Sequence, residues 1–382
     1  MCWTGPTRRV GPRAGRPVRR GRSAGCGILP QGTQGFRDYT MSKYFSIHLP
    51  RNLRPAVFLC LSLAAHCLAD SALALTRAEL YQAKAPMADR SEAAQTAAFQ
   101  AALTIVLVRV TGRRSAEDDP ALAPLLSNAR RYVQQYRGAP DGQMWVSFDG
   151  PAIERWLTQN GQPLWGHERP TTFVWLTAQS GPQTGSVITA NDTSDLKMAI
   201  DAAAALRGVP LLWPSAVDVQ RNHLDYAGVN GAAPSTLAEI GRRLGGEGIL
   251  IGRGSGTGES ANVRWIHVFQ DRSSEYSGAL EGVNRTADLY AGLFAASGNL
   301  VPIDMEVTGV GDLREYANVQ TYLESLTFVS HVSVVALTGD TVRFRLATRG
   351  GAESLQRTLA LNGRLQPLAA GDSGILRFQI RR

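Results

Sequence analysis

Cysteine is scarce in this chain of 382 residues, and its distribution is uneven. All four cysteines, Cys2, Cys26, Cys60 and Cys67, lie within the first 67 residues. The rest of the chain therefore cannot form a disulfide or a thiolate metal site, so its own apolar cores must stabilise it.

Patterns of metal ligands and catalytic nucleophiles are also lacking. Histidines 167, 223, 267 and 331 stand alone, with no histidine or cysteine two to four residues away. Structural zinc sites need four such ligands, usually in closely spaced pairs. After residue 74, the sequences Gly-x-Ser-x-Gly and His-Glu-x-x-His, which mark serine hydrolases and zinc proteases, do not occur. We therefore predict no metal, no bound cofactor and no catalytic set, and the sequence favours a non-enzymatic protein.

Lysine is almost missing after residue 74, where only Lys84 and Lys197 remain. Residues 1–74 hold 11 of the 40 Lys and Arg residues but only 2 of the 32 Asp and Glu residues. The remaining chain carries 29 basic and 30 acidic side chains and is close to neutral. Nucleic-acid binding needs clustered basic residues, and the arginines here are dispersed. We predict that nucleic acid is not a partner.

Residues 41–74 have the three parts of a secretory signal peptide. Lys43, Arg51 and Arg54 precede the apolar run 56–65, and Ala72-Leu73-Ala74 supplies small residues for cleavage. The apolar run is too short to span a bilayer, which takes about 20 residues. We predict export to the periplasm, cleavage after Ala74 and no transmembrane anchor in the mature chain.

Residues 1–40 are rich in Arg, Gly and Pro and show no apolar periodicity. A basic arm of this length ahead of a signal peptide would disrupt its short basic region, so we predict a mis-called start and translation from Met41. A lipid anchor is the less favoured alternative, because Cys60 follows Leu59 and Cys67 follows His66 instead of a small residue.

The mature chain is predicted to hold three domains, an α+β domain over 75–165, a mixed α/β domain over 166–298 and a third over 299–382. In the first, Ala98, Leu103 and Val106 share the apolar face of one helix. Gly112 follows this helix where a left-handed residue can end it. The expected elements are strand 80–87, helices 90–110 and 121–136, strand 144–148 and a helix from 151 to about 160.

The second domain alternates strands and helices. Strands are expected at 171–178, 209–213 and 248–252, with helices at 193–206 and 235–244 between them, followed by strands 262–270 and 275–280 and helix 286–296. A βαβαβ order favours parallel pairing, whereas the later hairpins favour antiparallel pairing, so the predicted sheet is mixed. The glycines between 252 and 258 precede a strand, not a helix, which favours a hairpin loop over a phosphate cradle.

The third domain is predicted to be ferredoxin-like. Strand 303–307 and helix 312–326 are followed by strands 331–337 and 341–347, helix 353–361, and last strands at 365–368 and 375–380. This βαββαβ order with an added edge strand is typical of the ferredoxin-like split βαβ arrangement.

One linker concentrates polar and aromatic residues directly before the strand at 171. Trp165, His167, Glu168 and Arg169 are therefore the candidate residues for an interaction site or interdomain cleft, since an aromatic beside an arginine is typical of binding hot spots. The competing and favoured interpretation is a structural linker in which Glu168 pairs with Arg169 while Trp165 packs.

Several segments resemble a known family. They are RSEAAQTAAFQAALTIVLVRVTG (90–112), YVQQY (132–136), WVSFDGPAIERWLTQNGQPLWGHERPTTFVWL (145–176) and DLREYANVQTYLESL (312–326). Over 76–368 the chain resembles the bacterial domain-of-unknown-function family numbered two-thousand-and-sixty-six. The resemblance implies an exported protein of Gram-negative bacteria and supplies no activity or catalytic residues. The helix and strands between 235 and 296 are also similar to the amino-terminal domain of envelope proteins such as TolB, an analogy of fold only.

Two functions remain open on these observations. The first is a periplasmic, non-enzymatic interaction or assembly module that offers a sheet edge or a domain cleft to an envelope protein partner. The alternative is a protein that uses an interdomain cleft near Trp165 to Arg169 to bind a small molecule or a glycan. Whether it also hydrolyses this ligand is left open by the sequence.

Overall fold

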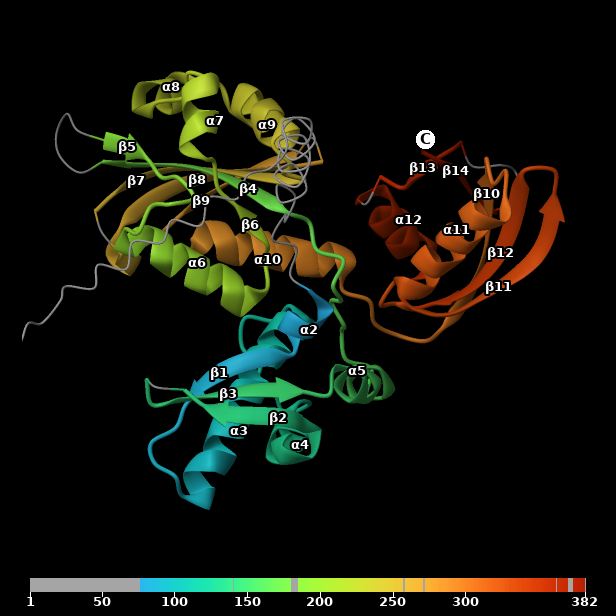
Figure 1. Cartoon of the computed structure of the whole chain (residues 1–382), viewed down its shortest axis with the longest axis horizontal. Coiled ribbons are helices and arrows are strands. Elements are labelled where there is room, and N and C mark those ends of the chain that lie inside the picture. The colour runs from blue at the N-terminus through green and yellow to red at the C-terminus, as the bar shows by residue number, and fades with distance from the viewer. Residues whose placement is uncertain are drawn as a thin grey trace, which may run out of the picture. The chain divides into compact units, whose positions relative to one another are not determined.

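The computed structural model describes residues 76–139, 141–179, 185–256, 258–270, 272–361, 363–369 and 374–381. Within these residues the protein is a mixed α/β structure with three sheets, one antiparallel and two mixed, and eleven α-helices (Figure 1). The predicted signal peptide and the segment before it lie outside the described residues.

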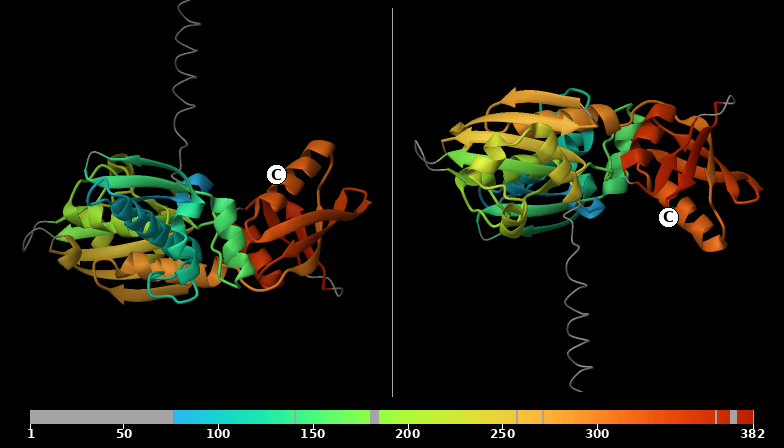
Figure 2. Two further views of the ribbon diagram at one scale, coloured as in Figure 1. Left: turned by 90° about the horizontal axis from the view of Figure 1, so that it is seen from below. Right: turned by 90° about the horizontal axis from the view of Figure 1, so that it is seen from above.

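The first sheet is antiparallel and has the strand order β1-β3-β2. Its strands are β1 (Gln82–Pro86), β2 (Val133–Gly138) and β3 (Gln143–Phe148). The helix α3 (Glu92–Thr111) lies along these strands (Figure 2, left) and buries Leu103, Val106 and Leu107 against them. Gly112 ends α3 in the left-handed conformation, with φ of 73°, as its position predicted. The shorter helices of this region are α2 (Arg77–Leu80), α4 (Ala123–Ser127), the 3-10 helix η1 (Ala129–Tyr132) and α5 (Gly150–Gln159).

Within the described residues, α3 is also the one helix long and apolar enough to cross a membrane. Half of its apolar window is buried inside the protein, however. The core helix of a soluble protein passes the same test of length and composition, and the packing of α3 on the sheet is what such a helix requires.

The helix predicted over 121–136 is wrong in its second half. The chain forms only α4 and the short helix η1 there, and from Val133 it continues as the edge strand β2. The sequence VQQYRG is largely exposed, and its apolar residues follow neither the helical period of about 3.6 residues nor the strand period of two. Hydrogen bonds to β3 therefore decide its conformation, and local sequence does not carry that signal.

The second sheet is mixed, with strand order β5-β4-β7-β8-β9 and with β6 paired to β4. Its strands are β4 (Thr172–Gln179), β5 (Gly185–Val187), β6 (Leu211–Leu212), β7 (Gly248–Ser255), β8 (Asn262–Phe269) and β9 (Arg272–Ser277). As predicted, β4 pairs in parallel with β6 and β7, whereas β7, β8 and β9 form antiparallel hairpins.

Helices cover both faces of this sheet (Figure 1). Alternate residues of β4 point to opposite sides, so Phe173 and Trp175 pack in one core and Val174 and Leu176 in another. The first core is closed by α8 (Tyr226–Gly231) and α9 (Pro234–Arg243), beside α7 (Ala216–Arg221), and the second by α6 (Asp195–Arg207) and α10 (Glu281–Phe294). This two-sided burial explains why β4 is a continuous apolar run.

Several details differ from the sequence prediction, which did not include β5 and placed β9 three residues too far along the chain. The strand expected over 209–213 shrinks to the two residues of β6, which lie between Pro210 and Pro214. The helices α7 and α8 were not predicted, although Ser215 and Asp218 form a capping box that marks the start of α7. Finally, α10 begins at Glu281, five residues before the predicted start.

The third sheet has the order β11-β12-β10-β14-β13. Its elements are β10 (Val301–Thr308), α11 (Leu313–Ser325), β11 (Val329–Thr338), β12 (Thr341–Thr348), α12 (Gly351–Leu361), β13 (Leu365–Pro367) and β14 (Leu376–Ile380). Val342, Phe344 and Leu346 of β12 point into the core that contains residues of α11 and α12. The opposite face carries ion pairs, Arg343 with Glu306 at 2.6 Å and Arg345 with Asp304 at 2.7 Å. The helices thus cover one face and leave the other polar.

Candidate functional site

The predicted site residues lie at a buried junction. Leu164 and Ala296 exchange two backbone hydrogen bonds, and Trp165 N donates to Val110 O at the end of α3. The Trp165 side chain is fully buried in a small core with Tyr290 and Phe294 of α10. The linker before β4 is therefore held by contacts with the end of α3 and with α10 and the residues after it.

Arg169 is buried beside Trp165 and donates hydrogen bonds to backbone carbonyls. Its guanidinium carbon lies 3.8 Å from the centre of the Trp165 ring. Its Nε donates to Gly166 O at 2.7 Å, Nη1 to Gly208 O at 2.8 Å, and Nη2 to Arg109 O and Trp165 O, both at 2.8 Å. The planar guanidinium thus satisfies carbonyl groups from three separate segments.

Two of these carbonyls stand at the C-terminal ends of helices, Arg109 O in the last turn of α3 and Gly208 O directly after α6. Helix C-termini carry partial negative charge, which stabilises a cation there. Burial, together with the smaller effect of the neighbouring Arg109, lowers the pKa of Arg169 to about 9. Arg169 still carries its charge at neutral pH and joins the ends of α3 and α6.

Two more buried arginines extend this junction. Arg109 donates from Nε to Ala205 O and from Nη1 to Glu79 O and Gln82 O, which connects α6, α3 and the start of β1. Burial lowers the pKa of Arg109 to about 10. Arg207 donates to Gly112 O at 3.0 Å and to Asp288 at 2.8 Å. The sequence pattern did not single out either residue, because both stand in the last turn of helices where arginine is common.

Glu168 and His167 face a different part of the chain. Glu168 Oε1 accepts a hydrogen bond from Thr327 N at 2.7 Å, and His167 Nδ1 lies 3.0 Å from Thr327 Oγ1. The ion pair expected between Glu168 and Arg169 is not among the contacts of the described residues, since each has another partner. A Cβ on Gly166 would lie 2.1 Å from Thr327 Oγ1, so only glycine permits this close approach.

The structure therefore brings the four predicted residues together, but not around an open cleft. Trp165, Glu168 and Arg169 are buried side chains, and only His167 is partly exposed. Arg169 and Glu168 bind backbone groups of this chain, His167 contacts the Thr327 hydroxyl, and Trp165 Nε1 is buried without a hydrogen-bond partner among the described residues. The arrangement connects the linker to the ends of α3 and α6 and to Thr327.

An exposed feature stands out in the third sheet, where β11 is the outer strand (Figure 1). β12 is its one strand neighbour in the described part of the chain. The ten residues of β11, VSHVSVVALT, include no Asp, Glu, Lys, Arg or Pro. Val334 and Leu337 are 46% and 69% exposed. Edge strands with free backbone groups usually carry charge or proline that blocks further pairing.

Leu313 belongs to the same region. Val310 N donates to Asp340 O at 2.8 Å, which fixes the start of α11 beside the β11–β12 turn. Leu313, the first residue of α11, is 81% exposed. We call Leu313, Val334, Val335 and Leu337 the edge patch.

The other sheet edges are protected. At the edges of the second sheet, β9 has the sequence RSSEYS with two charged residues and β5 is three residues long. In the third sheet β13 is three residues long and ends at Pro367, and in the first sheet β1 contains Lys84 and Pro86. β2 is polar and contains Arg137. Among the edges of the described sheets, β11 is therefore the long and uncharged one, the kind to which another strand can be added.

The fold defines the class of this protein, a mixed α/β protein with three sheets. The family model described as Domain of unknown function (DUF8605) matches residues 74–166, which is less than half of the chain. The expected membership of the family numbered two-thousand-and-sixty-six is therefore wrong; the helical patterns on which it rested, such as 90–112, also suit other core helices. Neither the curated proteins nor the solved structures gave a match.

Proposed function

We propose that this protein is an exported, non-enzymatic interaction module of the bacterial envelope, which binds an extended segment of a partner protein along β11. The single observation that carries the proposal is the unprotected edge of β11, with the edge patch beside it. In β-strand addition the backbone of the edge supplies affinity and alternate side chains supply specificity.

The register of β11 defines the chemistry of the partner segment. Val332 pairs with Leu346, Val334 with Phe344 and Leu337 with Val342, so these side chains point to the same face as the core residues of β12, although Val334 and Leu337 stay exposed. An added strand would place every second side chain over Val334 and Leu337. The partner segment is therefore extended and apolar at alternate positions, with polar residues between them.

The signal peptide pattern over 41–74 and the near-neutral composition of the rest support export to the periplasm. We also propose that the third sheet is a ferredoxin-like variant, which the order β14-β10-β12-β11 supports. The inserted strand β13 reverses the chain, so β14 runs parallel to β10. The likeness of the second domain to the TolB amino-terminal domain remains a proposal of fold.

The alternative of a small-molecule or glycan binder near Trp165 to Arg169 has less support. These side chains are mostly buried, Arg169 donates to carbonyls of this chain and Glu168 accepts from Thr327 N. None of the cavities found among the described residues is lined by them.

The test is site-specific crosslinking in a Gram-negative host that exports the full chain. A photo-reactive amino acid at position 337 reports on β11, and one at Ser273 reports on the protected edge β9. We expect position 337, and not 273, to crosslink to one envelope protein. The crosslink should disappear when Val334→Lys is added, because a lysine on an edge strand opposes pairing.

A peptide from the crosslinked segment of that partner then gives a direct measurement. It should protect the amides of 331–338 from hydrogen exchange in the purified protein. Equal crosslinking from both positions, or none from 337, would overturn the proposal. A crosslink to a second copy of this chain would show that β11 mediates self-association and would overturn the proposal of an envelope partner.

A further inference from the structure

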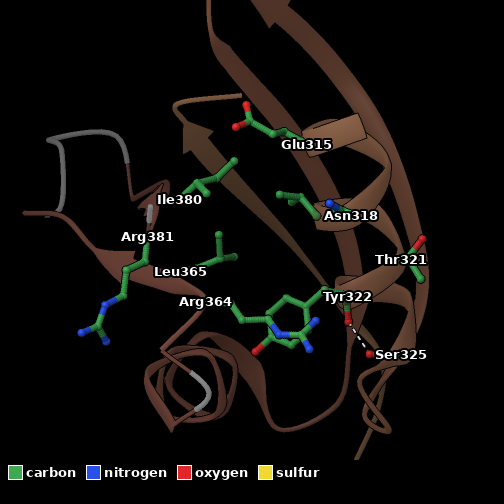
Figure 3. A pocket seen from close by; sticks show the side chains of 10 residues that line it. Glu315, Asn318, Thr321, Tyr322, Ser325, Arg364, Leu365, Ile380 and Arg381 are labelled. Carbon is green, nitrogen blue, oxygen red and sulfur yellow. Dashed lines mark hydrogen bonds between the residues drawn. The ribbon is translucent and has the colours of Figure 1, made fainter. Parts of the chain in front are cut away.

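A cavity of about 650 Å³ lies between α11 and the β13–β14 hairpin, on the side of the third sheet away from β11 (Figure 3). Pockets that bind small ligands or short peptide segments commonly have volumes of about 300 to 1,000 Å³. Neither the proposed role of β11 nor the junction at Trp165 uses this cavity.

The cavity combines an apolar floor with a polar rim. Val319 of α11 and the cross-strand pair Leu365 and Ile380 supply the floor. The rim includes side-chain amide and hydroxyl groups of Asn318, Thr321 and Ser325. Binding sites for small ligands typically have this composition, because apolar contacts supply affinity and a few polar groups fix orientation.

Charge is distributed unevenly around the rim. Glu315 lies at one end of the cavity and Arg364 at the other, with Arg381 on the hairpin side (Figure 3). Glu315 already accepts a hydrogen bond from Gly311 N at 2.6 Å. The Arg364 guanidinium lies 5.2 Å from the centre of the Tyr322 ring, which holds it at the rim.

These two arginines differ from those on the opposite face of the sheet. Arg343 and Arg377 pair with Glu306, and Arg345 pairs with Asp304. In the part of the chain that the structure describes, Arg364 and Arg381 have no carboxylate partner. Positive charge is therefore left without a paired carboxylate at the rim of the cavity.

We propose that this cavity binds a short apolar peptide segment through a carboxylate at its end. Arg364, which lies over the Tyr322 ring, would bind the carboxylate, for which its fork of guanidinium donors is suited. Arg381, whose side chain points away from Arg364 in Figure 3, would add positive charge on the hairpin side. The floor residues would contact apolar side chains. Asn318, Thr321 and Ser325 would bind peptide groups, which a simple hydrocarbon chain does not offer.

The experiment uses the exported full chain and a mixed library of acetylated tetrapeptides made from Ala, Val, Leu and Phe. One library has free C-terminal carboxylates and the other has C-terminal amides, and decanoate is the third probe. Retention by the protein is measured by ultrafiltration and mass spectrometry. We expect free acids to be retained at least about tenfold more strongly than amides, the effect of one charged hydrogen-bonding group.

Arg364→Gln should remove this preference and Arg381→Gln should reduce it, and Arg377→Gln is the matched control. Arg377 lies on the same hairpin but on the other face, so its loss should leave retention unchanged. Melting temperatures confirm that the variants fold. Equal retention of acids and amides, or loss in the Arg377 variant alone, would overturn the proposal. If decanoate bound as strongly as the best peptide and competed with it, the proposed ligand would be an acyl carboxylate instead of a peptide.

Discussion

The segment Trp165 to Arg169 and the edge patch depart from ordinary burial in opposite directions. The first buries charged and polar groups, and the second exposes apolar ones. In the first, hydrogen bonds to the carbonyls of α3 and α6 compensate the cost of burial. In the second, nothing in the described residues covers Val334 and Leu337. Buried polar groups here indicate structural connection, whereas exposed apolar groups indicate a surface available to a partner.

The strongest test of this comparison is Arg169→Ala. The substitution would leave several buried carbonyls without donors and remove the stacking on Trp165, so we expect a loss of more than about 3 kcal/mol of unfolding free energy. Urea denaturation followed by circular dichroism measures it. The control Arg345→Ala removes an exposed ion pair with Asp304 and should cost less than about 1 kcal/mol. Equal losses in the two variants would contradict the structural role of Arg169.

A second test concerns buried His267, which lies 3.4 Å from the hydroxyl of Tyr290. Burial lowers the pKa of His267 to about 4 from its ordinary value of 6.5. As the pH falls from 6.5 to 4, the unfolded chain binds a proton that the folded protein excludes, so stability decreases. The expected loss across this window is about 3 kcal/mol.

His267→Gln should flatten this part of the profile. The free energy of unfolding is measured between pH 7 and pH 4 for both proteins. Parallel curves for the two proteins would show that His267 does not contribute.

The close approach of the linker to Thr327 is tested by Gly166→Ala. The added methyl group would collide with the Thr327 side chain and with Glu168, and we expect a loss of about 1 to 3 kcal/mol. Gly231→Ala is the matched control, because a Cβ there meets no atom within 4 Å. Thermal unfolding distinguishes them. A Gly166 variant as stable as the control would show that the linker moves freely away from Thr327.

The smallest effect on stability is expected at the edge patch. Leu337→Lys changes an exposed side chain and should alter the unfolding free energy by no more than about 0.5 kcal/mol. The same variant should lose the crosslinked partner, since the lysine charge opposes strand addition. A large loss of stability would show that Leu337 belongs to the core and would weaken the proposed docking edge.

Much of the fold could be predicted from local sequence. The period of apolar residues in α3 and the glycine at 112, together with the apolar run of β4, were sufficient for those elements. β2 could not be predicted, because its polar residues become a strand only by pairing with β3. The environment of the candidate residues could not be predicted, because the sequence of 165–169 does not show that carbonyls at the ends of α3 and α6 converge on Arg169.

The sequence by itself determined the uneven placement of cysteine and charge, the signal peptide pattern, the alternation of strands and helices, and the residues that form the cores. These follow from composition and from periods of two or about 3.6 residues, which are local properties. Only the tertiary structure decided that Arg169 is buried, that β11 lies at an edge, and that Arg364 and Arg381 share a cavity with Glu315. Each of these depends on contacts between segments distant in the chain, and burial and edge position are properties of the assembled sheet.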